Sequence, residues 1–230
     1  MKWSRTGIVD ESAVTLLPQW LHPVADMARN SHVDDITRFA PAHDAGRHSA
    51  VLILFGEGES GPDLLIIERA SRMRAHAGQP AFPGGAVDPG DADAEAAALR
   101  EAHEETALRI DGVRTFGRLP DLYLPVTDFA VTPVLAWWKE PSPVHAAAPA
   151  EVASVHRIPI ATLVDPANRC RVRHPSGYIG AAFTVHGLVV WGFTAGLISA
   201  ILDGAGWAEP WDRDRIIAIS DASEVLEDPA

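Results

Sequence analysis

The chain has 230 residues, of which 47% are hydrophobic, and it carries a formal net charge of −12. A chain of this length and apolarity can bury a substantial core, and it suits one domain with extensions better than two full domains. The negative charge argues against broad nucleic-acid binding, because proteins that bind nucleic acids usually present a net basic face to the phosphates.

The cysteine content and the apolar segments favour a cytoplasmic protein without a membrane anchor. Cys170 is the single cysteine, so an intrachain disulfide is excluded, and no segment resembles a secretory signal with a basic and then an apolar region. The most apolar run, residues 187–202, is shorter than the roughly 20 residues that a membrane helix needs. We therefore expect a reducing cytoplasmic environment and a buried helix in this run.

The first part of the chain predicts an extension followed by a pair of strands. Residues 1–45 have mixed polarity, with a short helix expected over 14–20. The β-rich runs 49–55 and 63–69 flank a glycine-containing turn, which is typical of paired strands.

A helix is predicted over residues 93–107, after a basic loop and the turn Phe82-Pro83-Gly84-Gly85. Asp91 or Asp93 is suited to cap its N-terminus, where a carboxylate is favourable. Alanines occupy most of this helix, so we expect it to be largely covered by other elements.

The second half of the chain mixes strands and helices without a regular alternation. Strands are predicted over residues 112–119, 129–138, 151–156 and 181–190, a helical turn over 160–163 and a helix over 191–202. Pro133 favours an edge position for the strand 129–138, because proline cannot donate to a sheet ladder. The pattern predicts an α/β sandwich with a mixed sheet over residues 46–203, followed by an acidic tail, 204–230.

The predicted helix carries the residues with the clearest chemical meaning. At about 100° per residue, Glu101, Glu104 and Glu105 lie within roughly 100° of one another, beside Gly84 and Gly85. Magnesium prefers oxygen ligands, and a few carboxylates with water and substrate phosphate would complete its shell. The alternative is that these glutamates only pair with Arg100 and solvent, which contributes a few tenths of a kcal/mol per pair.

Residues 85–108 resemble the Nudix box, in which a glycine is followed by Arg-Glu-x-x-Glu-Glu on a helix. The match lies at Arg100, Glu101, Glu104 and Glu105. The chain departs from the pattern at four places: one extra residue between Gly85 and Arg100, Asp91 or Asp93 for the first Glu, Ala102 for a bulky aliphatic residue, and Ala107 for the final Gly.

The segment before the box resembles the signature of the coenzyme A diphosphatase branch of this family. Arg69-Ala70, Arg74, Gly78 and the turn 82–85 follow its spacing. This resemblance covers roughly residues 48–203 and implies a Nudix-type α/β/α sandwich with a mixed sheet. It also implies magnesium- or manganese-dependent hydrolysis of coenzyme A, or its thioesters, to 3',5'-ADP and 4'-phosphopantetheine.

The resemblance also implies roles for individual residues. Glu101, Glu104 and Glu105 would hold the metal ion, and Arg100 would orient Glu104. The substrate phosphates would be bound by arginines and by the close backbone approach that glycines allow; these residues are Arg69, Arg72, Arg74, Gly84 and Gly85.

The identity of the general base and of the substrate stays open in the sequence. Glu105 is the preferred base and Glu151 is a second candidate. The carboxylate helix specifies the reaction more than the substrate, so ADP-ribose or NADH is an alternative to coenzyme A. A catalytically silent domain that senses a ligand is a third hypothesis. We expect a small-molecule partner, no nucleic acid and no membrane, and the extensions at both ends are compatible with a homodimer.

Overall fold

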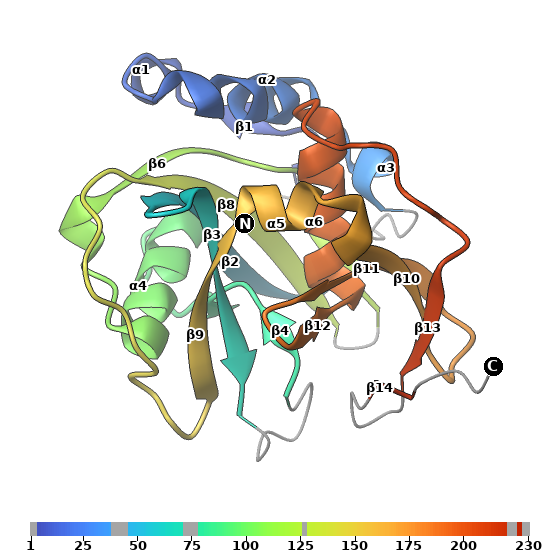
Figure 1. Cartoon of the computed structure of the whole chain (residues 1–230). Helices are drawn as coiled ribbons and strands as arrows, with labels where there is room; N and C mark the ends of the chain where they lie inside the picture. The colour runs from blue at the N-terminus through green and yellow to red at the C-terminus, as the bar shows by residue number, and fades with distance from the viewer. Residues whose placement is uncertain (1–3, 38–45, 71–77, 126–127, 220–224, 227–230) are drawn as a thin grey trace.

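The computed structural model describes residues 4–37, 46–70, 78–125, 128–219 and 225–226 of the chain. Within these residues, nine strands form one sheet and five form a second, smaller sheet (Figure 1). The first sheet contains β1 (Ile8–Val9), β2 (Arg47–Gly58), β3 (Gly61–Arg69), β4 (Pro80–Ala81), β5 (Gly84–Ala86), β6 (Val113–Arg118), β7 (Leu122–Leu124), β8 (Phe129–Trp138) and β9 (Val152–Pro159). The second contains β10 (Arg169–Arg173), β11 (Ile179–Val185), β12 (Leu188–Val190), β13 (Ile216–Ile219) and β14 (Val225–Leu226).

The helices cover both faces of the first sheet. The α-helices are α1 (Glu11–Val14), α2 (His22–Asn30), α3 (Val33–Ile36), α4 (Ala94–Thr106), α5 (Ile160–Val164) and α6 (Gly192–Gly204), and short 3₁₀ turns are η1 (Gln19–Leu21), η2 (Ile110–Gly112) and η3 (Pro166–Asn168). Helix α4 lies on one side, whereas α5 and α6 lie on the other, with α1 and α2 along one end (Figure 1).

The first sheet is mixed because its two longest strands run parallel. β2 pairs with β8 in parallel from Arg47 opposite Phe129 to Phe55 opposite Trp137. The other pairs in this sheet are antiparallel, including β2 with β3 and β3 with β9. Both faces of β2 are buried, so its continuous apolar run feeds two separate cores.

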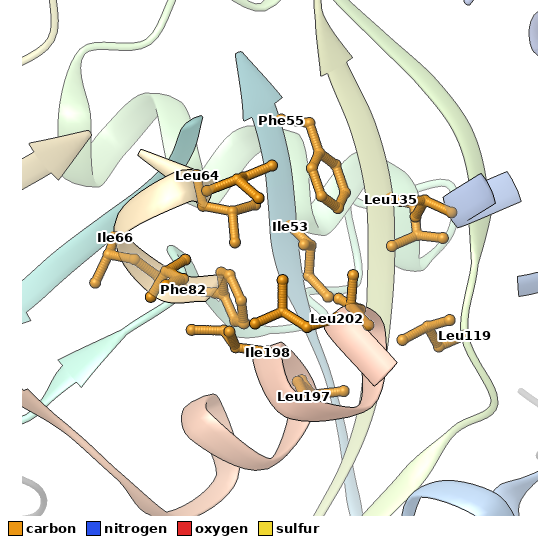
Figure 2. Packing of buried hydrophobic residues seen from close by; sticks show 14 of the residues in the cluster. Ile53, Phe55, Leu64, Ile66, Phe82, Leu119, Leu135, Leu197, Ile198 and Leu202 are labelled. Carbon is orange, nitrogen blue, oxygen red and sulfur yellow. The ribbon is translucent and has the colours of Figure 1, made fainter. Parts of the chain in front are cut away.

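Alternation along β2 sends successive side chains to opposite sides of the sheet. Leu52 and Leu54 pack with the alanines of α4. Ile53 and Phe55 face α6 and contribute to the larger cluster, which Figure 2 shows with Leu197, Ile198 and Leu202 pointing at the sheet. The layers are therefore helix, sheet and helix, which confirms the predicted α/β sandwich with a mixed sheet.

Helix α4 forms over the predicted segment and packs through its small residues. Asp93 caps its N-terminus by accepting from the backbone N–H of Ala96 at 2.9 Å. Ala94, Ala97, Ala98 and Ala102 are all buried against the sheet. The short side chains let the helix backbone approach β2 closely, which brings Glu101 and Glu105 to β5, the strand that contains Gly84 and Gly85.

Two predictions about local structure are wrong. The helix expected over residues 14–20 does not form: α1 ends at Val14 and the chain turns before η1. Pro133 lies in the centre of the sheet, because β8 sits between β6 and β2. The carbonyl of Pro133 accepts from the N–H of Leu119, so the carbonyl and the nitrogen of Pro133 both point towards the β6 side of β8. Because β6 ends at Arg118, one residue earlier, the N–H that proline lacks removes no hydrogen bond from β6.

The second sheet was only partly predicted. The expected strand 181–190 is a hairpin, β11 and β12, with a turn at His186 and Gly187, both of which have positive φ. Strand β10 was not predicted, nor was β13, which pairs with it in parallel. The expected buried helix corresponds to α6 and is confirmed, and in the described part of the chain no helix has the length and hydropathy of a membrane span.

The segments predicted as extensions contribute to the hydrophobic clusters of the fold. Leu21, Val24 and Val33 are buried in the cluster that α6 shares with the sheet, and Ile219 of the expected tail is buried in the second sheet. The division at residues 46 and 203 stays a prediction.

Candidate active site

The glycine turn and the carboxylate helix are in direct contact. The backbone N–H of Gly84 donates to Oε2 of Glu105 at 3.0 Å. A Cβ on Gly85 would lie 2.4 Å from Oε1 of Glu101, and one on Gly84 would lie 2.3 Å from the carbonyl oxygen of Ala50. A side chain at Gly84 would therefore push the turn away from β2, and one at Gly85 would displace the carboxylate of Glu101, so both glycines let the carboxylates lie against the backbone.

Glu105 is the most buried of the three glutamates. It is 3% exposed, and burial raises the pKa of its carboxyl group to about 7. The N–H of Gly84 and the charge of Arg69 counteract this increase in pKa, whereas the charges of Glu101 and Glu151 add to it. A nearby cation would relieve the repulsion among these carboxylates.

Glu101 and Glu104 have different surroundings. The side chain of Glu101 is 17% exposed, and burial raises its pKa although Arg100 opposes the shift. Glu104 is more than half exposed, with Oε2 at 3.4 Å from Nη1 of Arg100. Glu101 and Glu105 thus face the glycine turn, while Glu104 lies at the solvent edge of the same helix turn.

Arg100 is held by Asp91, whose role the sequence left undecided. Nε of Arg100 donates to Oδ1 of Asp91 at 3.0 Å, and Nη2 of Arg100 donates to Oδ2 of Asp91 at 2.9 Å. Nη2 also donates to the carbonyl of Ala86 at 3.0 Å, and Nη1 donates to Glu101 at 3.0 Å. Asp91 therefore fixes the guanidinium, and Arg100 in turn holds Glu101 and Glu104. Because Asp93 caps the helix, the two aspartates have separate tasks.

The pairing of the glutamates with Arg100 explains only part of the cluster. Arg100 contacts Glu101 and Glu104, but the bond that Glu105 makes is to the N–H of Gly84. The burial of the Glu105 carboxylate is costly, and Arg100 does not offset this cost. A purely structural ion pair would not leave a carboxylate in such surroundings. It is the environment expected of a group that meets a cation or a proton during function.

Arg69 and Glu151 reach this region from neighbouring strands. Arg69 ends β3, and its charge acts on Glu105; its Nε is buried and has no hydrogen-bond partner in the described residues. Glu151 precedes β9, is exposed, and its charge acts on Glu101 and Glu105. The carbonyl of Glu151 accepts from the N–H of Ala70 at 2.7 Å, which ties the two strand ends together.

The loop before Glu151 is attached to the end of α4. Ala147 donates its N–H to the carbonyl of Glu105, and His145 donates to that of Thr106, both at 3.0 Å. These bonds use carbonyls that a helix C-terminus leaves free. Arg72 and Arg74, predicted to bind phosphate, lie outside the described residues, in the segment 71–77.

The oxygen donors at this site fit a hard divalent cation. Two carboxylates with limited exposure and one at the edge provide the ligand type that magnesium and manganese accept. Among the residues that the structure describes, no three His, Cys, Asp or Glu side chains already converge in a metal-binding arrangement. Glu101, Glu104 and Glu105 are the residues that could hold the ion.

The model of the NUDIX domain family matches residues 46–173, which include the glycine turn, α4 and Glu151. The chain therefore belongs to the Nudix family and is a Nudix hydrolase; enzymes of this family typically depend on a divalent metal ion.

Curated relatives extend the similarity. The chain is 42% identical over 157 residues to "Uncharacterized Nudix hydrolase NudL" of Citrobacter koseri, covering 66% of this chain and 79% of the relative. The NudL protein of Escherichia coli K12 is 40% identical with the same coverage. Among solved structures, the Nudix hydrolase RenU of M. smegmatis gives a TM-score of 0.47 at 22% identity, covering 72% of this chain and 90% of that one.

Proposed function

We propose that this Nudix hydrolase cleaves the pyrophosphate of coenzyme A, or of its thioesters, to 3',5'-ADP and 4'-phosphopantetheine. The observation that carries the reaction is the contact of Glu101 and Glu105 with the glycine turn, with Arg69 and Glu151 acting on the same carboxylates. The choice of coenzyme A rests on the arginine-containing segment 69–85, which resembles the coenzyme A diphosphatase signature.

The carboxylates of α4 would hold one or more magnesium or manganese ions. Glu101, Glu104 and Glu105 are the proposed ligands; Asp91 positions the first two indirectly through Arg100, and the N–H of Gly84 holds Glu105. When bound, the ion would neutralise charge on the pyrophosphate oxygens and lower the pKa of the attacking water. The protein's own part is to keep these carboxylates oriented, which the double contact between Asp91 and Arg100 does.

Arg69 would bind a phosphate oxygen of the substrate. Its Nε is buried and has no partner among the described residues, so it can donate to an anionic ligand without first breaking a protein hydrogen bond. Its position beside Glu105 puts the anion-binding group next to the carboxylates. Arg72 and Arg74 are proposed to act with it on the same phosphates.

Glu105 is the preferred general base, and Glu151 is the second candidate. A base works best when its pKa lies near the pH of the reaction, and burial places Glu105 in that range. Glu151 is exposed, so its carboxylate can meet a substrate or a water molecule. Glu151→Gln and Glu105→Gln therefore give different losses of kcat if only one of the two accepts the proton.

The substrate is tested by product analysis with magnesium. Coenzyme A, ADP-ribose, NADH and an oxidised nucleoside triphosphate are incubated separately with the enzyme, and the products are separated by chromatography. We expect 4'-phosphopantetheine and 3',5'-ADP from coenzyme A, with the other compounds unchanged. Preferred turnover of ADP-ribose or NADH would replace coenzyme A as the substrate. Absence of turnover with all four compounds would favour the ligand-sensing alternative.

A further inference from the structure

Strand β10 presents a row of arginines to helix α6. Arg169, Arg171 and Arg173 occupy alternate positions, so they lie on one face of the strand. The residues between them, Cys170 and Val172, pack in an apolar cluster on the opposite face. Exposure rises along the row, from Arg169, which is 1% exposed, through half-buried Arg171 to exposed Arg173. The buried charge of Arg169 is costly unless something compensates it.

The guanidinium of Arg169 is only partly satisfied. Its Nη2 donates to Oγ of Ser199 at 3.0 Å and lies 3.7 Å from Oδ1 of Asp203, which is half exposed. Its Nη1 is buried and has no hydrogen-bond partner in the described ranges. Burial lowers the pKa of Arg169; Asp203 opposes this shift and Arg213 adds to it, so a second guanidinium lies near the first.

Trp211 contacts both of these arginines beside a cavity. The guanidinium carbon of Arg169 lies 4.9 Å from the centre of the Trp211 ring, and that of Arg213 lies 5.7 Å from it. Such contacts orient a cation without neutralising it. The ring therefore supports both guanidiniums and does not cancel their charge.

A cavity of about 390 Å³ lies beside this ring. It is lined by Arg171, Ser199, Asp203, Trp211 and Arg213, and by Gly180 and Ala181, whose small side chains leave space beside Arg171. Ser199 and Trp211 both contact Arg169, so the buried guanidinium of Arg169 lies directly behind the lining of the cavity.

The charge at the cavity is positive although the chain as a whole is acidic. Two arginines, Arg171 and Arg213, line the cavity and Arg169 lies behind it, whereas one carboxylate, that of Asp203, belongs to the lining. The neighbours of Arg213 in sequence, Asp212 and Asp214, are exposed, and Oδ1 of Asp212 accepts from the N–H of Asp214. The compensating group expected here is an anion.

We propose that this cavity binds the phosphate group of a small phosphorylated molecule. Guanidinium groups match the oxygens of a phosphate in pairs of parallel hydrogen bonds, which Arg171 and Arg213 can make at the lining, and the buried charge of Arg169 behind them favours an anion. The volume falls in the range of small-molecule sites, so it holds an organic part as well as the phosphate. No residue of the glycine turn or of α4 lines the cavity, so the site is separate from the candidate active site.

Titration calorimetry of the full chain tests the proposal without turnover. The protein is titrated with glycerol 3-phosphate and, separately, with inorganic phosphate, in a chelating buffer at constant ionic strength. Arg171→Ala and Arg213→Ala are each expected to weaken binding by roughly tenfold or more, because each loses a charged hydrogen-bond donor. Thermal unfolding confirms that both variants fold; neither arginine is fully buried.

A matched control separates this site from general charge effects. Arg173→Ala removes the same charge from the same strand outside the cavity, so binding should stay unchanged. Tighter binding of glycerol 3-phosphate would identify an organic phosphate as the ligand, and equal binding would identify phosphate alone. Absence of binding to the native chain, equal weakening by Arg173→Ala, or tighter binding of acetate than of either phosphate would overturn the proposal.

Discussion

The glycine–carboxylate site beside α4 and the arginine cavity beside α6 both gather like charges, and in each group at least one charge is buried. In the first, the charges are Glu101, Glu104 and Glu105, within about one turn of one helix. In the second, Arg169, Arg171 and Arg213 come from a strand and from a loop far along the chain. Both arrangements lower the free energy of unfolding, and binding of an oppositely charged ligand would offset this loss.

The difference between the two regions lies in how they are assembled. The first is built from residues 84–105, where local turn and helix geometry almost suffice. The second requires β10 to pair with β11 and α6 to cover Arg169 through Ser199. A site made by local structure is recognisable as a motif, whereas a site made by packing has no continuous signature.

The largest expected effect is the loss of metal-dependent turnover in Glu104→Gln. An amide cannot supply the negative charge that a magnesium ligand needs, so we expect kcat to fall by roughly a thousandfold, while the exposed position of Glu104 leaves the fold intact. Steady-state kinetics across magnesium concentrations measures it. Glu95→Gln, an exposed change in the first turn of the same helix, is the control. Unchanged turnover in Glu104→Gln would remove this residue from the site.

Glu105→Gln should stabilise the protein when divalent ions are chelated. Because the folded-state pKa is raised from 4.5 to about 7, the contribution of Glu105 to stability is present below pH 4.5 and is lost as the pH rises towards 7. At pH 8 the amide avoids that loss, which amounts to at most about 3 kcal/mol.

Thermal or urea unfolding at pH 8 and pH 4 checks this expectation. The advantage of Glu105→Gln should be clear at pH 8 and absent at pH 4, where the native carboxyl is protonated in both states. Added manganese should raise the melting temperature of the native protein more than that of the variant. A variant that is less stable than the native protein at pH 8 would contradict the burial cost assigned to Glu105.

Asp91→Asn should reduce kcat by roughly tenfold to a hundredfold with the fold retained, as expected for a residue that orients ligands through another group. The amide keeps one acceptor for Arg100, but loses the charge and the second bond. The apparent magnesium affinity should weaken with kcat, which a purely structural role would leave unchanged. Asp88→Asn is the matched control, because Asp88 is exposed and 3.7 Å from Arg100.

Ser199→Ala tests the support of the arginine cavity. It leaves Nη2 of buried Arg169 without its hydrogen-bond acceptor at 3.0 Å, so we expect a loss of about 1–2 kcal/mol in the free energy of unfolding. Denaturant unfolding in chelating buffer measures it. Glycerol 3-phosphate should restore part of this loss if the anion contacts Arg169. A neutral effect would show that water replaces the hydroxyl and that Arg169 is not held by α6.

The smallest expected effect is at the end of α4. Ala107 has a φ of 58°, in the left-handed region that favours glycine. Ala107→Gly should therefore stabilise the fold by about 0.5–1 kcal/mol, whereas Ala96→Gly, within the same helix, should destabilise it by about the same amount. Paired thermal unfolding compares them. A stabilisation in both variants, or in neither, would contradict the assignment of the effect to backbone conformation.

Periodicity and turn chemistry predicted most of the fold around the first site. The buried strands β2 and β3, helix α4 and helix α6 appear where apolar runs and capping residues place them. The central position of β8 was missed, because the tolerance of Pro133 depends on where its neighbour β6 ends. The residue at which β6 ends is set by how β6 pairs with β8, and the residues around Pro133 do not reveal it.

At the candidate site, the sequence identified the glutamates and the glycine turn but not the part of Asp91. A carboxylate near the start of a helix can either cap the helix or accept hydrogen bonds from an arginine. Only the conformation of the turn after β5 decides that Asp93 does the first and Asp91 the second. The alternating arginines of β10 were a visible period-two pattern. The sequence did not predict where this row lies, because a row of arginines on a solvent-exposed face and one covered by a helix have the same sequence pattern.

The sequence by itself determined the class of chemistry, because Arg100, Glu101, Glu104 and Glu105 need only one helix to come together beside Gly84 and Gly85. Tertiary structure alone decided which carboxylate is buried and which arginines enclose a cavity. The physical reason is that burial depends on elements distant in sequence: Glu105 is enclosed by the turn before α4 and by the loop after β8, and Arg169 by α6 and Trp211.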